Sequence, residues 1–217
     1  MGNFEELRSE MVNGQLIPRG ISDPQVLEAF RKVPRDEFIP ESMRASAYDD
    51  AALPIGIGQT ISQPYMVAIM TELLKLKGNE KVLEVGTGSG YQAAILSQLC
   101  KKVFTIERIE SLAVQAKETL KKLGYTNVEF IIGDGTLGYP KESPYEGIIV
   151  TAGCPEIPSL LIDQLADGGR LVIPVGETYL QTLTVVTKKE GKLKFEESIA
   201  CVFVPLIGKF GWKENRG

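Results

Sequence analysis

The chain has 217 residues, 43% of them hydrophobic, which is enough to bury one substantial core and excludes a disordered, collagen-like or coiled-coil protein. Its 24 basic and 28 acidic residues give a formal charge of -4, so the composition offers no basic footprint for nucleic acid or an anionic membrane. The chain has no histidine, which excludes Ser–His and Cys–His catalysis and histidine-bound metals.

Targeting and metal-binding signatures are also missing from the sequence. Residues 1–6 lack a basic stretch followed by an apolar run, and no window approaches the roughly 18 apolar residues of a membrane span. We therefore expect a soluble, cytoplasmic protein, and separately we expect a monomer. The cysteines are odd in number and far apart, so we predict no disulfide framework and no metal site. Apolar neighbours favour burial of all three, Cys100, Cys154 and Cys201.

The N-terminal part of the chain, residues 1–60, predicts a helical and irregular extension of a larger unit. Apolar residues have helical spacing over residues 4–12. Asp23 followed by Pro24 marks the start of a second helix, because Pro is favoured at a first helical position after a capping side chain. Residues 41–60 show no regular pattern, so we expect them to be irregular.

Short apolar strands alternate with helices through residues 64–176, which predicts an α/β fold with a mainly parallel, doubly wound sheet covered by helices on both faces. Residues 177–217 predict an antiparallel hairpin at one sheet edge and a tail, and the whole chain, 1–217, is expected to be one domain. The expected strands are 82–85, 103–106, 128–132, 147–151 and 170–175. The expected helices are 64–77, 91–100, 110–123 and 157–165. Gly168-Gly169 is expected to end the last of them, before the strand 170–175.

The first of these strands is joined to its helix by a glycine-rich turn, Glu84-Val85-Gly86-Thr87-Gly88-Ser89-Gly90-Tyr91. Such a turn lets a ligand approach the backbone closely, and the helix N-terminus adds free N–H donors. Nucleotide, dinucleotide and adenosylmethionine sites all use this arrangement. A dinucleotide fingerprint would need glycine in place of Tyr91, and the Gly-Lys-Ser/Thr of a P-loop does not occur here.

Three acidic residues follow successive strands, at the edge where open α/β sheets bind ligands. Glu84 ends a buried strand and needs a partner, either the ammonium group of a methionine-derived ligand or a loop N–H. Glu107 can accept both hydroxyls of a ribose. Asp134 can accept from an adenine amino group, and an ordinary Asx turn is the alternative. Together the three carboxylates indicate an adenosyl site.

These segments resemble the successive motifs of class I S-adenosylmethionine-dependent methyltransferases: 84–91, Thr105-Ile106-Glu107-Arg108, Gly133-Asp134-Gly135 and 170–176. The resemblance implies a Rossmann-like, seven-stranded methyltransferase sheet that binds S-adenosyl-L-methionine and releases S-adenosyl-L-homocysteine. The residues that it places against this cofactor are Glu84, Gly86, Thr87, Gly88, Gly90, Glu107, Arg108, Asp134, Gly135 and Gln63.

Three further segments look like those of the protein-L-isoaspartate (D-aspartate) O-methyltransferase family: Gly58-Gln59-Thr60-Ile61-Ser62-Gln63-Pro64, Val150-Thr151-Ala152-Gly153 and Phe203-Val204-Pro205-Leu206. The match extends from about residue 15 to the end of the chain. It implies methylation of the free α-carboxylate of L-isoaspartyl residues in damaged proteins and peptides, which initiates their repair. D-aspartyl residues are a second acceptor that the resemblance leaves open.

On the acceptor side, the resemblance makes Ser62 the active-site residue. Some family members have His where this chain has Tyr65, so no role of that imidazole carries over. The residues expected to line the ligand channel or hold the peptide are Thr60, Ile61, Ser62, Gln63, Val204, Pro205 and Leu206. For the last three of these, packing of an apolar strand end on the core is an equally good interpretation.

The reaction suits a chain without histidine. An α-carboxyl group has a reference pKa of about 3.3 to 3.7, so the acceptor is already ionised at neutral pH and needs no base. Catalysis then depends on placing a carboxylate oxygen in line with the methyl group. We therefore interpret Ser62 as a hydroxyl donor that orients the carboxylate, because no base stands beside it to make it a nucleophile.

Three other functions fit the sequence less well. A methyltransferase acting on a small molecule is the main alternative, since the core motifs do not define the acceptor, but the segment around Ser62 argues against it. An NAD-binding oxidoreductase is disfavoured by the glycine spacing and by the lack of a Tyr-x-x-x-Lys sequence. A non-catalytic binding module is disfavoured because Glu84, Glu107 and Ser62 are all present.

Overall fold

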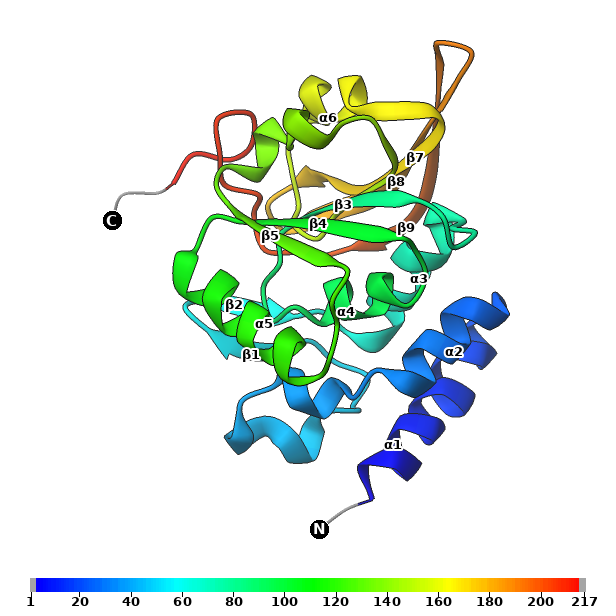
Figure 1. Ribbon diagram of the computed structural model, residues 1–217, viewed down its shortest axis with the longest axis vertical. Helices are drawn as coiled ribbons and strands as arrows, with labels where there is room; N and C mark the ends of the chain where they lie inside the picture. Colours follow the sequence, from blue (N-terminus) through cyan, green and yellow to red (C-terminus); the bar gives the residue numbers. More distant parts are fainter. Residues whose placement is uncertain (1–2, 215–217) are drawn as a thin grey trace.

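The computed structural model describes residues 3–214, and its centre is one seven-stranded sheet (Figure 1). The strands are β3 (Lys81–Val85), β4 (Lys102–Glu107), β5 (Val128–Ile132), β6 (Tyr145–Val150), β7 (Leu165–Glu177), β8 (Leu180–Lys189) and β9 (Lys192–Cys201). Their order is β5-β4-β3-β6-β7-β8-β9. Pairing is parallel from β5 to β7 and antiparallel from β7 to β9, which confirms the predicted doubly wound, mainly parallel sheet with an edge hairpin.

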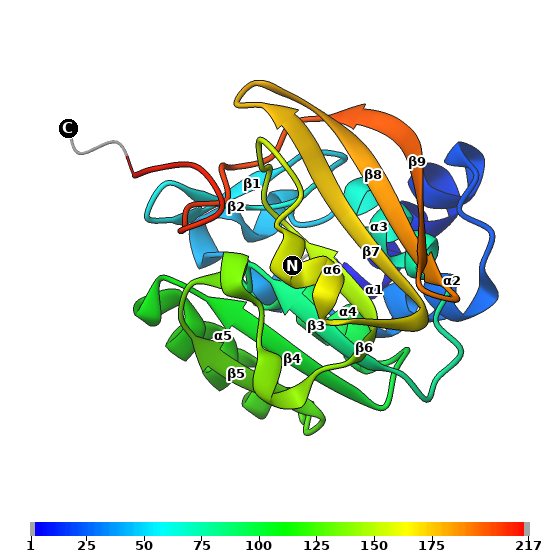
Figure 2. The same cartoon turned by 90° about the horizontal axis from the view of Figure 1, so that it is seen from above.

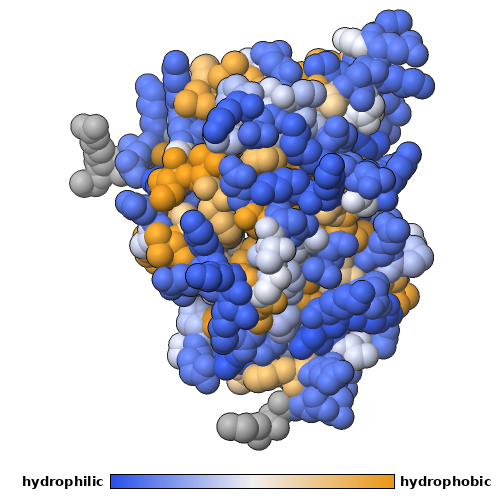
Figure 3. All heavy atoms as spheres, in the orientation of Figure 1, coloured by the Kyte–Doolittle hydropathy of each residue, from blue (hydrophilic) through white to orange (hydrophobic). Residues whose placement is uncertain are grey.

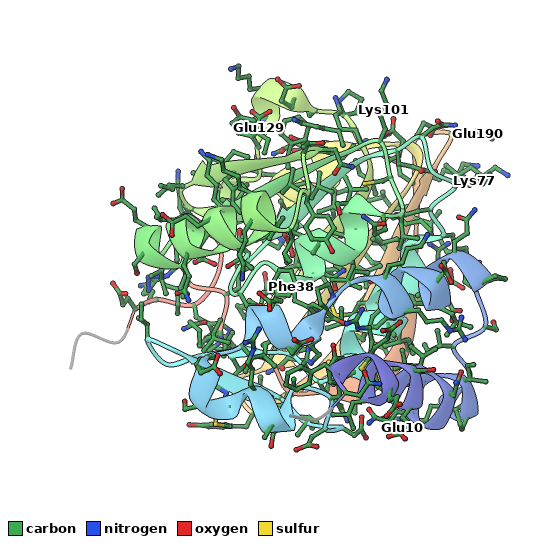
Figure 4. All side chains as sticks on the ribbon, turned by 60° about the horizontal axis from the view of Figure 1, so that its bottom comes forward. Glu10, Phe38, Lys77, Lys101, Glu129 and Glu190 are labelled. Atoms are coloured by element: carbon green, nitrogen blue, oxygen red, sulfur yellow. The ribbon has the colours of Figure 1, made fainter. Side chains whose placement is uncertain are left out.

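The connections explain where a crevice forms. From β3 the chain winds outward to β4 and β5, and β6 then returns to the other side of β3. Ligands bind to open α/β sheets at such a reversal, outside the carboxyl ends of the strands. Lys77 and Lys101 precede β3 and β4, and Figure 4 shows them near one rim, which is the opposite, amino end. A crevice is therefore expected between β3 and β6, at the far end of the sheet.

Helices cover both faces of the sheet. The helices are α1 (Phe4–Met11), α2 (Pro24–Lys32), α3 (Pro64–Leu74), α4 (Tyr91–Ser97), α5 (Glu110–Lys122) and α6 (Ser159–Asp163). In Figure 1, α4 and α5 lie below the sheet and α6 lies above it, while α1 and α2 form an outer layer. Alternate residues of β3 reach different cores, since Val82 packs with α3 whereas Leu83 packs with α6. Burial on both faces explains why the central strands are continuously apolar.

Tyr91, the first residue of α4, connects the outer layer to the glycine-rich turn. Its ring centroid lies 6.1 Å from that of Phe30 and 5.5 Å from that of Phe38. The guanidinium of buried Arg35 lies 5.0 Å from the Tyr91 centroid. Figure 4 labels Phe38 where the N-terminal segment meets the helices below the sheet. The N-terminal extension therefore supports the start of α4 directly.

One expectation about the N-terminal extension was wrong. Residues 41–60 contain an antiparallel hairpin of β1 (Leu53–Gly56) and β2 (Gln59–Ile61), in addition to a 3₁₀ segment, Glu41–Ser46. The turn residues Ile57 and Gly58 both have positive φ, the conformation that two-residue hairpins require. The strands are too short to produce a clear alternating pattern, so they could not be recognised from hydrophobic periodicity.

The predicted break at Gly168-Gly169 was also wrong, because both glycines lie inside β7. A Cβ at Gly169 would come within 3.0 Å of three backbone carbonyl oxygens, including that of Tyr145 on β6. The pairing of β6 with β7 shifts register at this point. These glycines therefore form an irregularity within a paired strand, and α6 is shorter than predicted. The helices α3 and α4 also end earlier than expected, at Leu74 and Ser97.

The two ends of the chain border the sheet from different sides. Figure 2 shows β8 and β9 curling away from the parallel strands, and the segment after β9 running back toward β1 and β2. Figure 3 shows a largely hydrophilic surface, with hydrophobic atoms gathered on the side where the C-terminal segment lies.

No helix in residues 3–214 is long and apolar enough to cross a membrane. Positions 1, 2 and 215–217 of the two predicted terminal regions lie outside the described residues.

Candidate active site

A cavity of about 1020 Å³, counted out to open solvent, lies at the carboxyl ends of β3, β4 and β6. We call it the turn cavity because the glycine-rich turn forms its floor. The residues predicted for the cofactor that line it are Gly86, Thr87, Gly88, Glu107, Arg108 and Gly135. The residues predicted for the acceptor that line it are Thr60, Ile61, Ser62, Val204, Pro205 and Leu206. The structure therefore brings most of the predicted site together.

The backbone of the turn is held in a shape that favours glycine. Gly86 and Gly88 have φ values of 98° and 52°, in the left-handed region. A Cβ at Gly86 would also overlap Oγ1 of Thr151, which donates toward the Gly86 carbonyl oxygen at 2.6 Å. The predicted contact of Gly90 with the cofactor stays a prediction. Gly90 does not line the turn cavity, and a Cβ there would lie 2.7 Å from Cδ1 of Leu120 on α5.

Glu107 is oriented by the backbone on both sides of its carboxylate. Oε2 accepts a hydrogen bond from the Gly88 N–H at 3.0 Å, and Oε1 accepts one from the Ile109 N–H at 2.9 Å. The residue is only 7% exposed, yet it lines the turn cavity. Each oxygen has one protein donor and a remaining lone pair. The carboxylate is therefore pre-oriented to accept two adjacent hydroxyl groups.

Glu84 lies beneath the turn and is fully buried. Thr87 Oγ1 lies 2.6 Å from Thr105 Oγ1, and Thr105 in turn donates to Glu84 Oε2 at 2.5 Å. Oε1 has no hydrogen-bond partner in the described part of the chain. Burial raises the pKa of Glu84 to about 8, against the opposing effect of the Thr105 hydrogen bond. The carboxyl group is thus mostly protonated at neutral pH, and no loop N–H caps it.

Asp134 makes the contacts of an Asx turn. Oδ1 accepts from the N–H and the hydroxyl of Thr136, and Oδ2 accepts from the Lys209 N–H at 2.7 Å. Partial burial alone would raise the pKa of Asp134, but these hydrogen bonds from Thr136 and Lys209 lower it below its usual value. The side chain is not among those that line the turn cavity, although Gly135 is. Its visible contacts therefore anchor the C-terminal segment, and the adenine contact stays a prediction.

Gln63 also lies away from the turn cavity. Its Nε2 donates to the Asp50 carbonyl oxygen at 3.1 Å, and the residue lines a second cavity of about 960 Å³, counted out to solvent. We call this second hollow the outer cavity. The two cavities share five residues, which mark the junction between them: Thr60, Ser62, Thr151, Phe203 and Val204.

Ser62 lies at this junction, one residue after the end of β2 and just before α3. Its hydroxyl makes no hydrogen bond to any residue in 3–214. The side chain is half-buried, so the hydroxyl can donate to a ligand that reaches the junction. The absence of histidine leaves no imidazole to remove its proton. Ser62 is therefore placed as a hydrogen-bond donor and is poorly equipped as a nucleophile.

The segment after β9 forms the opposite wall. The Gly153 N–H donates to the Val204 carbonyl at 2.8 Å, and the Leu206 N–H donates to the Gly153 carbonyl at 2.7 Å. Leu206 is 6% exposed and packs on the core, whereas Pro205 is exposed toward the cavity. Val204 and Leu206 therefore combine core packing with lining of the cavity, Pro205 only lines it, and contact of the three residues with a peptide stays a prediction.

Two lining residues had no predicted role in the site, Thr151 and Arg19. Thr151 was noted only as part of a family segment, yet it hydrogen-bonds the turn and borders both cavities. Arg19 was assigned no role, but it lines the outer cavity from the N-terminal extension. Because Arg19 is far in sequence from every motif, no local pattern could have indicated it.

Cys100 and Cys154 line neither cavity, whereas Cys201 is among the residues that line the outer cavity. All three are free and buried, as predicted. Burial raises the pKa of the Cys100 and Cys154 thiols to about 12, so they are protonated at neutral pH. No cluster of three or more Cys, Asp or Glu residues suited to a metal ion occurs within residues 3–214.

The doubly wound sheet, the glycine-rich turn and the oriented Glu107 carboxylate at the end of the next strand are features of class I methyltransferases. A solved structure that aligns over 96% of this chain with a TM-score of 0.84 and 31% identity is a protein-L-isoaspartate O-methyltransferase. The chain belongs to the protein-L-isoaspartate(D-aspartate) O-methyltransferase family, whose model matches residues 7–211. The family was the one that the motifs around Ser62 predicted.

Individual relatives support this membership over nearly the full length. The chain is 56% identical to protein-L-isoaspartate O-methyltransferase 2 of Geotalea uraniireducens, covering 98% of each chain. It is also 56% identical to the Geobacter metallireducens protein-L-isoaspartate O-methyltransferase, covering 97% of this chain and 98% of that one. Among solved structures, a Plasmodium falciparum beta-aspartate methyltransferase in complex with S-adenosyl-L-homocysteine aligns with a TM-score of 0.81 and 28% identity, covering 95% and 99% of the two chains.

Proposed function

We propose that this chain transfers a methyl group from S-adenosyl-L-methionine to the free α-carboxylate of L-isoaspartyl residues in proteins and peptides, which initiates their repair. The single observation that carries the acceptor assignment is the position of Ser62. Its unpartnered hydroxyl lies where the turn cavity opens into the outer cavity. A cofactor in one cavity and a peptide in the other would meet at this hydroxyl.

The turn cavity fits the cofactor by the chemistry of its donors and acceptors. The Glu107 carboxylate is held so that both oxygens can accept ribose hydroxyls. The buried Glu84 carboxyl has one unpartnered oxygen beneath the turn, and a nearby ammonium group would favour its ionised form. Gly86 and Gly88 let the ligand lie close to the backbone. When bound, S-adenosyl-L-methionine supplies an electrophilic methyl group on a positively charged sulfur.

The acceptor side requires no proton transfer. The α-carboxylate is ionised at neutral pH, so one of its oxygens already holds the electron pair that forms the new C–O bond. Ser62 donates a hydrogen bond to the other oxygen and orients the group, while Thr60 and Val204 limit its movement at the junction. A single donor suits this step, because additional hydrogen bonds would lower the nucleophilicity of the carboxylate.

The proposal includes isoaspartyl-containing proteins and peptides as partners and a monomeric enzyme. The outer cavity is open to solvent, which would allow a peptide to continue out of the molecule on either side of the modified residue.

A direct test compares paired peptides that differ only in Asp versus isoAsp. Each is incubated with the protein and S-adenosyl-L-methionine labelled on the methyl group. We expect base-labile label on the isoAsp peptide alone, because a methyl ester hydrolyses in mild base. Equal label on both peptides, or no label on either, contradicts the proposed function.

A further inference from the structure

An arginine–tyrosine pair lies in the outer cavity, away from the junction with the turn cavity. The Arg19 guanidinium carbon lies 3.6 Å from the centroid of the Tyr65 ring, which is a stacked cation–π contact. Arg19 comes from the N-terminal extension and Tyr65 from the first turn of α3. The Tyr65 side chain is buried, so its ring provides a fixed surface for the guanidinium. Both residues line the outer cavity, and neither lines the turn cavity.

Asp50 forms hydrogen bonds with one nitrogen of the Arg19 guanidinium and leaves the other two nitrogens free. Both Asp50 oxygens accept from Nη1 of Arg19, at 3.1 and 3.0 Å. Nε and Nη2 of Arg19 have no hydrogen-bond partner within residues 3–214. The Arg19 side chain is 40% exposed, so these donors are accessible from the cavity. Both oxygens of Asp50 therefore already accept hydrogen bonds, whereas the Nε and Nη2 edge of the Arg19 guanidinium has no partner in the described residues.

The two charges that line the outer cavity cancel, so any attraction for an anion comes from the unpartnered donors at the free edge of Arg19. Arg19 and Asp50 are the only charged lining residues of this cavity within the described chain. A second carboxylate could accept from the free Nε–H and Nη2–H in the fork geometry that guanidinium groups favour. Arg19 does not belong to the residues shared by the two cavities, so we assign it a carboxylate other than the one that reacts at Ser62.

We propose that Arg19, held on the ring of Tyr65, determines substrate specificity by binding an acidic side chain that flanks the isoaspartyl residue. The inference rests on the proposed function, since it concerns the peptide that enters the outer cavity. Asp50 limits the effect, because it competes with the peptide for the same guanidinium. Tyr65 acts as a positioning residue that keeps the guanidinium flat against the cavity wall.

The test uses isoaspartyl peptides in which one Glu is moved through the positions on either side of the isoAsp, each paired with its Gln counterpart. For the unmodified protein we expect kcat/KM to favour Glu over Gln by about three- to tenfold at one position, and this ratio to approach one at about 0.5 M salt. R19Q should abolish the ratio, R19K should restore it in part, and D50N should increase it.

Two variants make the test specific. Y65F keeps the ring and should keep the Glu/Gln ratio, whereas Y65L removes the ring and should lower it. K117Q makes the same charge change as R19Q on the exposed face of α5 and should leave the ratio unchanged. The measured quantity is the Glu/Gln ratio of kcat/KM within a single variant. A loss of overall activity or stability affects both peptides equally, so it does not change this ratio.

The outcomes separate this inference from the proposed function. If the Gln peptides are methylated and no position shows a Glu preference, or R19Q retains the preference of the unmodified protein, the role of Arg19 is wrong and the methyltransferase assignment stands. If no isoaspartyl peptide is methylated, both are contradicted.

Discussion

The two cavities that meet at Ser62 are built in different ways. The turn cavity rests on neighbouring βα units, in which β3, the glycine-rich turn and β4 carry Gly88 and Glu107. The outer cavity is assembled from the N-terminal extension, the loop before β1, the start of α3 and the segment after β9. The first region therefore depends on local geometry, and the second depends on how distant segments pack against one another.

This difference in construction separates binding of the cofactor from choice of the substrate. A glycine-rich turn with Glu107 beside it can hold an adenosyl group in any methyltransferase of this fold. The acceptor wall is contributed by parts of the chain that lie outside the central α/β core, including Arg19 and Val204. Substrate choice can therefore change without altering the cofactor side, and substitutions should separate the two regions.

The largest expected effect comes from Ser62→Ala, which removes the donor at the junction. We expect turnover to fall by about a hundredfold, because a poorly oriented carboxylate reacts slowly, while the affinity for S-adenosyl-L-methionine changes less than threefold. Steady-state kinetics and titration calorimetry measure the two quantities. Ser111→Ala, on exposed α5, is the matched control. A loss of affinity with normal turnover would remove Ser62 from the catalytic role.

Glu107→Ala should have the opposite pattern. The substitution removes the acceptor for two backbone N–H groups and for the ribose, so we expect cofactor affinity to fall by about ten- to a hundredfold. Turnover at saturating cofactor should fall much less. Calorimetry on this variant and on Glu118→Ala, an exposed site on α5, makes the comparison. Unchanged affinity in Glu107→Ala would mean that the turn cavity does not bind the ribose through this carboxylate.

Glu84→Gln sharpens the comparison through pH, since this carboxyl belongs only to the turn region. The pKa of Glu84 is raised from 4.5 to about 8 on folding, so the folded state holds its proton longer than the unfolded state does. Its contribution to stability is fully present below pH 4.5 and is lost as the pH rises through about 8. The neutral amide of Gln has no such loss.

Between about pH 6 and pH 8, the ligand-free protein should therefore lose roughly 2 kcal/mol of stability relative to Glu84→Gln. Urea unfolding of both proteins at several pH values gives this difference directly. Parallel pH curves would show that Glu84 is ionised in the folded state at neutral pH.

The smallest effect is expected for Asp134→Ala. It removes the acceptor for Thr136 and Lys209, so we expect a loss of about 1 kcal/mol in the free energy of unfolding. If the side chain acts only through these contacts, cofactor affinity should change less than threefold. A larger drop in affinity in calorimetry would support the predicted adenine contact, and Asp134→Asn, which keeps one carbonyl acceptor, would then be the milder variant.

Much of the turn region could be predicted because its determinants are local. The strands around Val82 and Val103 are continuous apolar runs, and the positions of Glu84 and Glu107 follow from where those strands end. A local motif does not show which other element a residue contacts. The glycine at Gly90 leaves room for Leu120 of α5, and this packing requirement could not be predicted from the turn alone.

The outer cavity was harder to predict because the segments that form it are far apart in sequence. The β1–β2 hairpin consists of strands too short to show a period, although it leads directly into the Ser62 segment. Asp134 was assigned from its place after β5, whereas its visible contacts are set by a segment near the C-terminus, at Lys209. Contacts between residues so far apart in sequence leave no local pattern.

The sequence by itself determined the class of fold, the position of the glycine-rich turn and the family, because hydrophobic periodicity and motif spacing are properties of neighbouring residues. Only the tertiary structure decided that the turn cavity and the outer cavity share Ser62, and that Arg19 lies on Tyr65 beyond it. Those arrangements form because the two ends of the chain pack against the carboxyl edge of one sheet. Residues that are far apart in sequence become neighbours there, and no local pattern records such contacts.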